Sequence, residues 1–290
     1  MGRIMQNVID THIHVWNLAQ VDYAWLKGDT SILNRTYELE ELEDDRKASG
    51  ITAGVLVQAA NSLEETAWMI KTAQKHRWIT GIVGWLPLQD PDATARILGT
   101  DYRPGMILKG VRHLIHDEAD ARWLLQDAVL ESLGLLAAND IPYDLVGILP
   151  AHIETALKVA ERWPKLRMIF DHLNQPPILK QDKRWEELMK EAARHDRFYA
   201  KISGLGTAAG KGLSWTAGDL EPCIEFVLHH FGVDRCCCGG DWPVSLLAGT
   251  YEKTWKAYHT VISNYLTWEE QNKILYQNAT QFYGLAPVGP

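Results

Sequence analysis

Two histidines separated by one residue, His12 and His14, stand at the end of a short apolar run near the start of the chain. On a β-strand, side chains two positions apart leave from the same face, so both imidazoles would point the same way. Such a pair can bind a divalent metal ion or form a hydrogen-bonding cluster around a substrate. Two core histidines that are satisfied by their neighbours remain the alternative for the pair taken alone.

Further ionisable residues lie at or near the ends of other short apolar runs. They are Arg112 and His113, Asp144, Asp171 and His172, Lys201 with the following Ser203, and Asp241. Burying so many polar groups for packing alone would be costly. The pattern therefore favours one shared site.

These runs belong to a pattern of short apolar segments that alternate with longer segments of helical periodicity. Such a pattern predicts a parallel sheet covered by helices on both faces, and eight units close into a (β/α)₈ TIM barrel. A doubly wound open sheet is the alternative. In a barrel the strand ends meet at one mouth, so the ionisable residues would converge there. The expected strands are residues 8–14, 53–58, 79–85, 108–114, 142–146, 167–172, 198–202 and 236–240. The expected helices are residues 37–49, 63–75, 91–98, 120–138, 153–163, 185–194, 220–231 and 251–283, the last with a break near Leu266.

No linker or composition shift divides the chain, which predicts a single barrel domain over residues 1–290. One glycine-rich segment, residues 203–219, is too long for an ordinary connection and predicts either a lid over the site or a plain connector. Its Gly204-x-Gly206-x-x-Ala209 run resembles a dinucleotide fingerprint. The acidic strand end that should follow about 20 residues later is missing, so nucleotide binding is not favoured.

The composition is that of an ordinary globular protein, with 46% hydrophobic and 23% charged residues. A formal net charge of -8 without a basic stretch argues against nucleic acid as a partner. No window reaches the roughly 20 apolar residues of a membrane span, and no apolar signal core precedes the first strand. We therefore expect a cytoplasmic protein. Consecutive Cys236, Cys237 and Cys238 alternate in direction on a strand and are expected to be buried packing residues.

Several motifs in a fixed order carry a family resemblance. The chain begins with Asp10-Thr11-His12-Ile13-His14 and later contains Gly239-Gly240-Asp241-Trp242-Pro243. Between and after them come Lys109-Gly110-Val111-Arg112-His113, Pro164 to Arg167 with Phe170-Asp171-His172-Leu173, Lys201 to Leu205, and Asn278-Ala279-x-x-Phe282-Tyr283-Gly284-Leu285. The set resembles the amidohydrolase superfamily, within it the amidohydrolase 2 branch of sugar-lactone hydrolases, such as fuconolactonase and rhamnonolactonase, which is related to pyrone-dicarboxylate lactonase.

The resemblance implies an amidohydrolase-like fold with His12, His14, His172 and Asp241 as the catalytic core, and the same four side chains as ligands of at most one metal ion. Two-metal members of the superfamily carry a histidine at the end of strand five, where this chain has Asp144. They also often carry a glutamate or carboxylated lysine at strand four. The branch includes members that work without metal, so one zinc ion and no metal both stay open.

Opening a cyclic ester needs an activated water, a stabilised oxyanion and a positioned substrate. Asp241 can act as the base for the water, and the three histidines can polarise the carbonyl, directly or through a metal. Arg112, His113 and Lys201 are candidates for binding substrate hydroxyls or a carboxylate, with structural ion pairs as the alternative. Trp16 and Trp242 flank the proposed ligands and could stack on a sugar ring.

The predicted function is therefore hydrolysis of a sugar-acid lactone to the hydroxy acid, a step of carbohydrate metabolism with a small molecule as the partner. A zinc-dependent decarboxylase of an aromatic or muconate-type acid is the alternative on the same scaffold. A barrel that binds a sugar acid without catalysis is the third hypothesis, and a full set of base and imidazoles argues against it. A homo-oligomer is compatible with the sequence.

Overall fold

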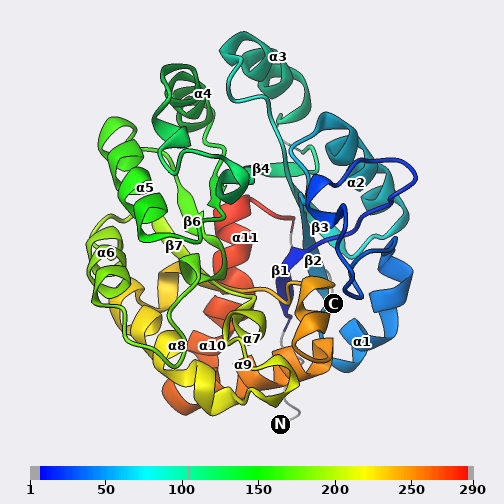
Figure 1. The fold of residues 1–290 in the computed structure, drawn as a ribbon, viewed down its shortest axis with the longest axis vertical. Helices are drawn as coiled ribbons and strands as arrows, with labels where there is room; N and C mark the ends of the chain where they lie inside the picture. Colours follow the sequence, from blue (N-terminus) through cyan, green and yellow to red (C-terminus); the bar gives the residue numbers. More distant parts are fainter. Residues whose placement is uncertain (1–6, 104, 287–290) are drawn as a thin grey trace.

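The computed structural model describes residues 7–103 and 105–286. Within these ranges eight parallel strands follow one another in chain order around a barrel, with helices outside them (Figure 1). This architecture confirms the predicted (β/α)₈ barrel. The strands are β1 (Ile9–Ile13), β2 (Ala53–Val57), β3 (Ile79–Gly84), β4 (Leu108–His113), β5 (Tyr143–Leu145), β6 (Met168–Phe170), β7 (Phe198–Ile202) and β8 (Cys236–Cys238).

The first and last strands meet just beyond their carboxyl ends. Ile13 and Trp242 form a parallel bridge. The His14 N–H donates to the Trp242 carbonyl at 2.7 Å, and the Asp241 N–H donates to the His12 carbonyl at 2.8 Å. These bonds join the two edges of the sheet, which rules out the doubly wound alternative and brings the two strands' polar residues together.

The outer helices begin where the sequence supplies N-terminal caps. The Ser62 hydroxyl accepts from the Glu65 N–H at the start of α2, and Pro91 occupies the first turn of α3. The helices of the outer layer are α1 (Glu43–Ala48), α2 (Leu63–Lys75), α3 (Pro91–Asp101), α4 (Asp127–Ala138), α5 (Pro150–Arg162), α6 (Lys183–Ala193), α8 (Ala217–Phe231) and α9 (Tyr251–Tyr265). No helix in the described ranges combines the length and apolar character that a membrane span requires.

Some expected elements are divided. The predicted helix at 37–49 consists of a 3₁₀ turn, Leu39–Leu42, followed by α1. The predicted helix at 120–138 consists of a 3₁₀ turn, Trp123–Leu125, followed by α4, because the backbone at Gln126 is extended between them.

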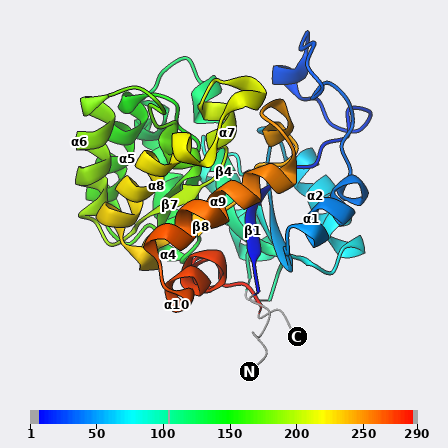
Figure 2. The ribbon, with the colours of Figure 1, turned by 90° about the horizontal axis from the view of Figure 1, so that it is seen from below.

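The glycine-rich segment at 203–219 is not a continuous loop. It contains the short helix α7 (Leu205–Ala208) and a 3₁₀ turn, Gly212–Ser214. Gly210 and Gly212 adopt positive φ angles of 65° and 52°, conformations that interrupt a helix. Figure 2 shows α7 at one end of the barrel and α10 (Trp268–Asn272) at the opposite end.

A helix at the end of the chain closes the amino-terminal end of the barrel. After α10 a π-helical turn, Lys273–Gln277, leads to α11 (Asn278–Tyr283), which lies within the ring of strands (Figure 1). Its buried side chains pack against interior strand residues to form what we call the floor cluster. The floor cluster consists of Ile9, Ala53, Val55, Val57, Val83, Ile169, Cys237, Ala279, Phe282, Tyr283 and Leu285.

The three consecutive cysteines are all buried and free, as expected of packing residues. Cys237 points into the barrel as part of the floor cluster, and Cys236 and Cys238 pack in the outer core between sheet and helices. This alternation follows from the two-residue repeat of a strand.

Candidate active site

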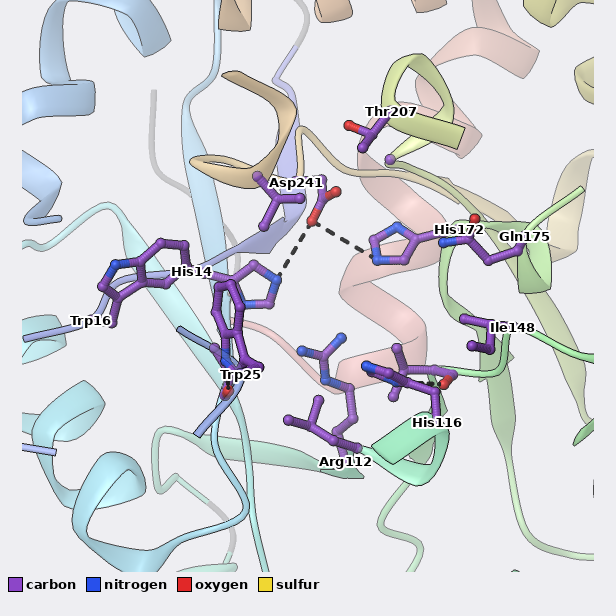
Figure 3. A pocket seen from close by; sticks show the side chains of 15 residues that line it. His14, Trp16, Trp25, Arg112, His116, Ile148, His172, Gln175, Thr207 and Asp241 are labelled. Atoms are coloured by element: carbon purple, nitrogen blue, oxygen red, sulfur yellow. Dashed lines mark hydrogen bonds and ion pairs between the residues drawn. The ribbon is translucent and has the colours of Figure 1, made fainter. Parts of the chain in front are cut away.

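A cavity of about 230 Å³ opens at the carboxyl ends of the strands (Figure 3). Its volume lies just below the roughly 300–1,000 Å³ typical of ligand pockets, so it suits a small substrate. Its walls combine aromatic, imidazole and carboxylate side chains with a single guanidinium. The lining residues are His14, Trp16, Trp25, Ala59, Arg112, Leu114, His116, Val146, Ile148, His172, Gln175, Gly204, Thr207, Asp241 and Val244.

His12 and His14 stand at the end of β1 with their Nε2 atoms 3.1 Å apart. His14 Nδ1 donates to the Val57 carbonyl at 2.7 Å. With the proton on Nδ1, the lone pair of His14 Nε2 faces the cavity. Burial lowers the pKa of His14 and holds the pKa of His12 well below its usual range. Both rings are therefore neutral, the form of imidazole that binds metal ions.

Asp241 follows β8 and directs its carboxylate at the three histidines. Its Oδ1 lies 3.5 Å from His14 Nε2 and 3.9 Å from His172 Nε2 (Figure 3). The same oxygen lies 3.7 Å from His12 Nε2. A φ of 55° at Asp241, in the left-handed region that non-glycine residues rarely adopt, accompanies this orientation. The carboxylate is thus the common neighbour of all three imidazoles.

The donor set fits one divalent metal ion. The ligand atoms of His12, His14 and Asp241 all lie within 4.8 Å of one another, and within the described ranges no second group of this kind occurs. Two imidazoles and a carboxylate are the ligand types that catalytic zinc uses when it keeps one position open. These three side chains could hold one ion, and His172, the fourth expected ligand, lies outside this group.

His172 reaches the centre from the turn after β6. Its backbone has φ 53° and ψ 32°, and its Nδ1 lies 2.9 Å from the Ser203 hydroxyl. Gly204, with φ 63°, leaves room for this ring: a Cβ there would lie 2.6 Å from His172 Nδ1 and 3.0 Å from Asp241 Oδ2. Glycine is therefore required next to Ser203.

Asp10 ties the ends of β1 and β8 together beneath the centre. Its Oδ1 accepts from the backbone N–H groups of His12 and Gly240, and its Oδ2 accepts from the Tyr251 hydroxyl at 2.6 Å. Burial raises the pKa of Asp10 to about 7, against the effect of these bonds. Asp10 in the Asp-Thr-His-Ile-His motif thus positions backbone at the site and does not line the cavity.

Below His12 lies a set of four buried charged side chains, the buried charge cluster, which comprises Arg112, Asp144, Asp171 and Lys201. Lys201 Nζ donates to Asp144 Oδ2 at 2.6 Å and lies 2.7 Å from Asp171 Oδ1. Arg112 donates to Asp171 Oδ2 at 2.9 Å. Two cations and two carboxylates alternate, so the buried charges balance.

Asp171 is the centre of this cluster. Its Oδ1 also lies 3.5 Å from His12 Nδ1, so one carboxylate contacts Lys201, Arg112 and a histidine of the site. Burial alone would raise the pKa of Asp171, but Lys201 and His12 beside it hold the pKa well below its usual range. Asp171 therefore stays ionised.

Three of the predicted substrate-binding residues do not reach the cavity wall. Lys201 is fully buried in the charge cluster. His113 points to the opposite face of β4 from Arg112, stacks on Trp123 at 3.9 Å between ring centroids, and lies 2.6 Å from a Glu118 oxygen. Trp242 is buried edge-to-face against another aromatic ring. Of the five residues predicted to bind substrate, Arg112 and Trp16 line the cavity, and Lys201, His113 and Trp242 are not among its lining residues.

Other lining residues come from the segments that connect the strands to the outer helices, including short helical turns, and were not named as site residues from the sequence. They are Trp25, His116, Gln175 and Thr207. Loop side chains carry no periodicity, so only the presence of polar and aromatic residues between predicted elements could have suggested them. Thr207 belongs to the segment 203–219, which thereby reaches the cavity.

Trp25 is held by a chain of bonds. It lies in the 3₁₀ turn Ala24–Leu26, and its indole N–H donates to the Ala59 carbonyl at 2.8 Å. The N–H groups of Ala59 and Ala60 donate to the buried Glu65 carboxylate at 2.9 and 2.7 Å. Burial raises the pKa of Glu65 to about 8. The loop after β2 thus fixes the aromatic wall.

The fold and this centre together define a (β/α)₈-barrel enzyme whose histidine and carboxylate side chains meet at the carboxyl ends of the strands. Residues 9–285 match the family model described as amidohydrolase. The chain belongs to the amidohydrolase family, as the ordered motifs indicated.

Relatives cover nearly the whole chain. An L-fucono-1,5-lactonase of Burkholderia ambifaria is 31% identical over 280 residues, which cover 95% of this chain and 94% of the relative. An L-fucono-1,5-lactonase of Burkholderia multivorans is 30% identical, with 96% of each chain covered. The crystal structure of an amidohydrolase from Burkholderia multivorans with bound zinc is 28% identical, covers 97% of this chain and 100% of its own, and superposes with a TM-score of 0.87.

Proposed function

We propose that the protein hydrolyses a neutral sugar-acid lactone to the open hydroxy acid. The observation that carries the proposal is the convergence of the Asp241 carboxylate with His12, His14 and His172 at the base of a small cavity. Similarity to two lactonases over nearly the entire chain supports the same substrate class.

The reaction adds water to the lactone carbonyl and breaks the bond from the carbonyl carbon to the ring oxygen. Asp241 accepts a proton from the attacking water and returns it to the ring oxygen as that bond breaks. His172, oriented by Ser203, faces Asp241 and donates a hydrogen bond as charge develops on the carbonyl oxygen. When zinc is bound by His12, His14 and Asp241, it supplies Lewis acidity for the carbonyl.

The charges around the cavity favour an uncharged substrate. Arg112 is the one lysine or arginine among the described lining residues, and it is already bonded to Asp171 and to the Gln58 carbonyl. A dicarboxylate would need additional cations. The cavity wall offers uncharged polar groups instead. Burial lowers the pKa of His116, which favours its neutral form. Gln175 and Thr207 supply hydrogen bonds suited to hydroxyls.

Segment 203–219 forms part of this proposal as a lid. Gly204 and Thr207 line the cavity, and the Thr207 hydroxyl is buried without a partner among the described residues. A substrate hydroxyl would provide that partner.

The proposal also places the enzyme in the cytoplasm, because its four cysteines are all free, as is usual in a reducing compartment.

A panel of lactones tests the proposed function. We expect neutral five- and six-membered aldonolactones to be opened, as measured by acid release with a pH indicator, and pyrone dicarboxylate to be opened slowly or not at all. Each assay is run with and without chelator and after zinc is restored. Absence of lactone opening, together with zinc-dependent decarboxylation of an aromatic acid measured by CO₂ release, would overturn the proposal in favour of the decarboxylase.

Trp25→Ala is expected to raise KM for the lactone about tenfold, equivalent to about 1.4 kcal/mol of lost binding, with little change in kcat. The indole forms an apolar wall and touches none of the reacting groups. Trp25→Phe keeps a flat ring and should lie between the wild type and Trp25→Ala. A fall in kcat at unchanged KM would contradict a role in binding.

A further inference from the structure

The terminal motif Asn278-Ala279-x-x-Phe282-Tyr283 has no role in the proposed reaction, yet it reaches into the barrel. Tyr283 ends α11 and is almost fully buried in the floor cluster. Its hydroxyl donates to Asp144 Oδ2 at 2.7 Å. The apolar floor of the barrel is thus bonded to the charge cluster above it through one side chain.

Asp144 depends strongly on this bond. The Asp144 carboxylate accepts two hydrogen bonds in the described structure, from Lys201 and from Tyr283, and both end on Oδ2. Its other oxygen, Oδ1, is buried and has no hydrogen-bond partner among the described residues. Loss of the Tyr283 hydroxyl removes one of two donors to a fully buried carboxylate. The Asp144 carboxylate would then be held by Lys201 alone, so it could move and draw Lys201 Nζ away from Asp171.

From Asp144 the contacts continue to the catalytic histidine. Lys201 Nζ lies 2.7 Å from Asp171 Oδ1 and 3.3 Å from His12 Nδ1. Asp171 in turn binds Arg112, whose NH1 lies 3.3 Å from His12 Nε2. Both nitrogens of His12 therefore face groups of the charge cluster, and the orientation of the ring depends on where those groups stand.

We propose that Tyr283 is a positioning residue of the active site: from the floor of the barrel, it holds Asp144 and Lys201 so that Asp171 and Arg112 keep His12 in place. The effect of this role on kcat for lactone opening rests on the proposed lactonase function. The role requires the hydroxyl group, not the bulk of the ring.

Tyr283→Phe tests this role because it removes the hydroxyl and keeps the ring. We expect kcat for lactone opening to fall about tenfold while KM stays within about twofold, since the cavity wall is unchanged. Phe282→Leu is the matched control, because Phe282 shares the helix and the floor cluster but its side chain has no hydrogen-bonding group to offer the buried charge cluster. It should lower the melting temperature and leave kcat unchanged.

A double-mutant cycle shows whether Tyr283 acts through Asp144. In an Asp144→Asn background, Tyr283→Phe should have little further effect on kcat. Equal fold losses in the wild-type and Asp144→Asn backgrounds, or an unchanged kcat in Tyr283→Phe, would overturn the proposal. If Asp144→Asn does not fold, the kcat of the two single variants, Tyr283→Phe and Phe282→Leu, decides the matter.

A readout without substrate separates this inference from the proposed function. The ring protons of buried His12 are observable by NMR, and we expect them to shift in Tyr283→Phe but not in Phe282→Leu. Unshifted His12 signals in Tyr283→Phe overturn the positioning role. If the wild type opens no lactone while these signals shift as expected, the proposed function has failed and the positioning role stands.

Discussion

Asp241→Asn is expected to lower kcat for lactone opening by roughly 10²- to 10⁴-fold while the lactone still binds. The amide keeps the size of the side chain, but it replaces one carboxylate oxygen with an NH2 group and cannot accept the proton of the attacking water. Turnover is measured by acid release at saturating lactone. Binding is measured by calorimetry with the same variant, since it no longer consumes the ligand quickly.

The control is Asp234→Asn, which alters an exposed carboxylate that pairs with Lys273 on the surface, shortly before β8. It should keep the wild-type kcat. Retention of full turnover in Asp241→Asn would place the base elsewhere. A wild type that binds lactone without any turnover would support the non-catalytic barrel.

Asp171→Asn is expected to lower the free energy of unfolding by about 3–5 kcal/mol. The substitution leaves two buried cations, Lys201 and Arg112, with a single carboxylate, that of Asp144, which pairs with Lys201. An unbalanced buried cation is costly because it loses hydration without a compensating charge. Urea unfolding followed by tryptophan fluorescence measures the difference.

The effect should depend on pH in a defined direction. The folded-state pKa of Asp171 lies well below its usual range, so the stability from this carboxylate is fully present above its unfolded pKa of about 3.9. It is lost as pH falls through the lower folded value. The difference between wild type and Asp171→Asn should therefore be constant near neutrality and shrink in strong acid.

Asp140→Asn is the matched control for stability. Asp140 pairs with Arg167 at 3.0 Å, but its side chain is 82% exposed. Exposed pairs contribute about 0–1 kcal/mol, so this variant should stay close to wild type. A loss in Asp171→Asn no larger than that in Asp140→Asn would contradict the view that the buried charges balance one another.

The barrel was predictable because its signal is repeated. Each short apolar strand is followed by a helical segment, so an error in one unit does not change the count. Helix boundaries were less predictable where a single extended residue, such as Gln126, divides a segment that is apolar throughout. The spacing of apolar residues does not report the backbone conformation at a single position, so such a break cannot be predicted from it.

The site was predictable where strand direction determines it. His12 and His14 share a face because they are two residues apart, and Asp241 follows the strand that pairs with theirs. Adjacent residues such as Arg112 and His113 were harder to assign, since only one of them can face the interior and the sequence does not mark which. Trp25 was missed because its place depends on a loop held by Glu65.

The closure of the barrel by α11 has a consequence for how the protein is made. β1 leaves the ribosome first, but its edge is completed only by β8, and the interior below His12 is completed only when Tyr283 arrives. The surroundings of His12 on β1 are therefore complete only after β8 and α11 have been made. During synthesis the nascent chain has no assembled catalytic centre until β8 and α11 have been translated, so activity appears only after that point.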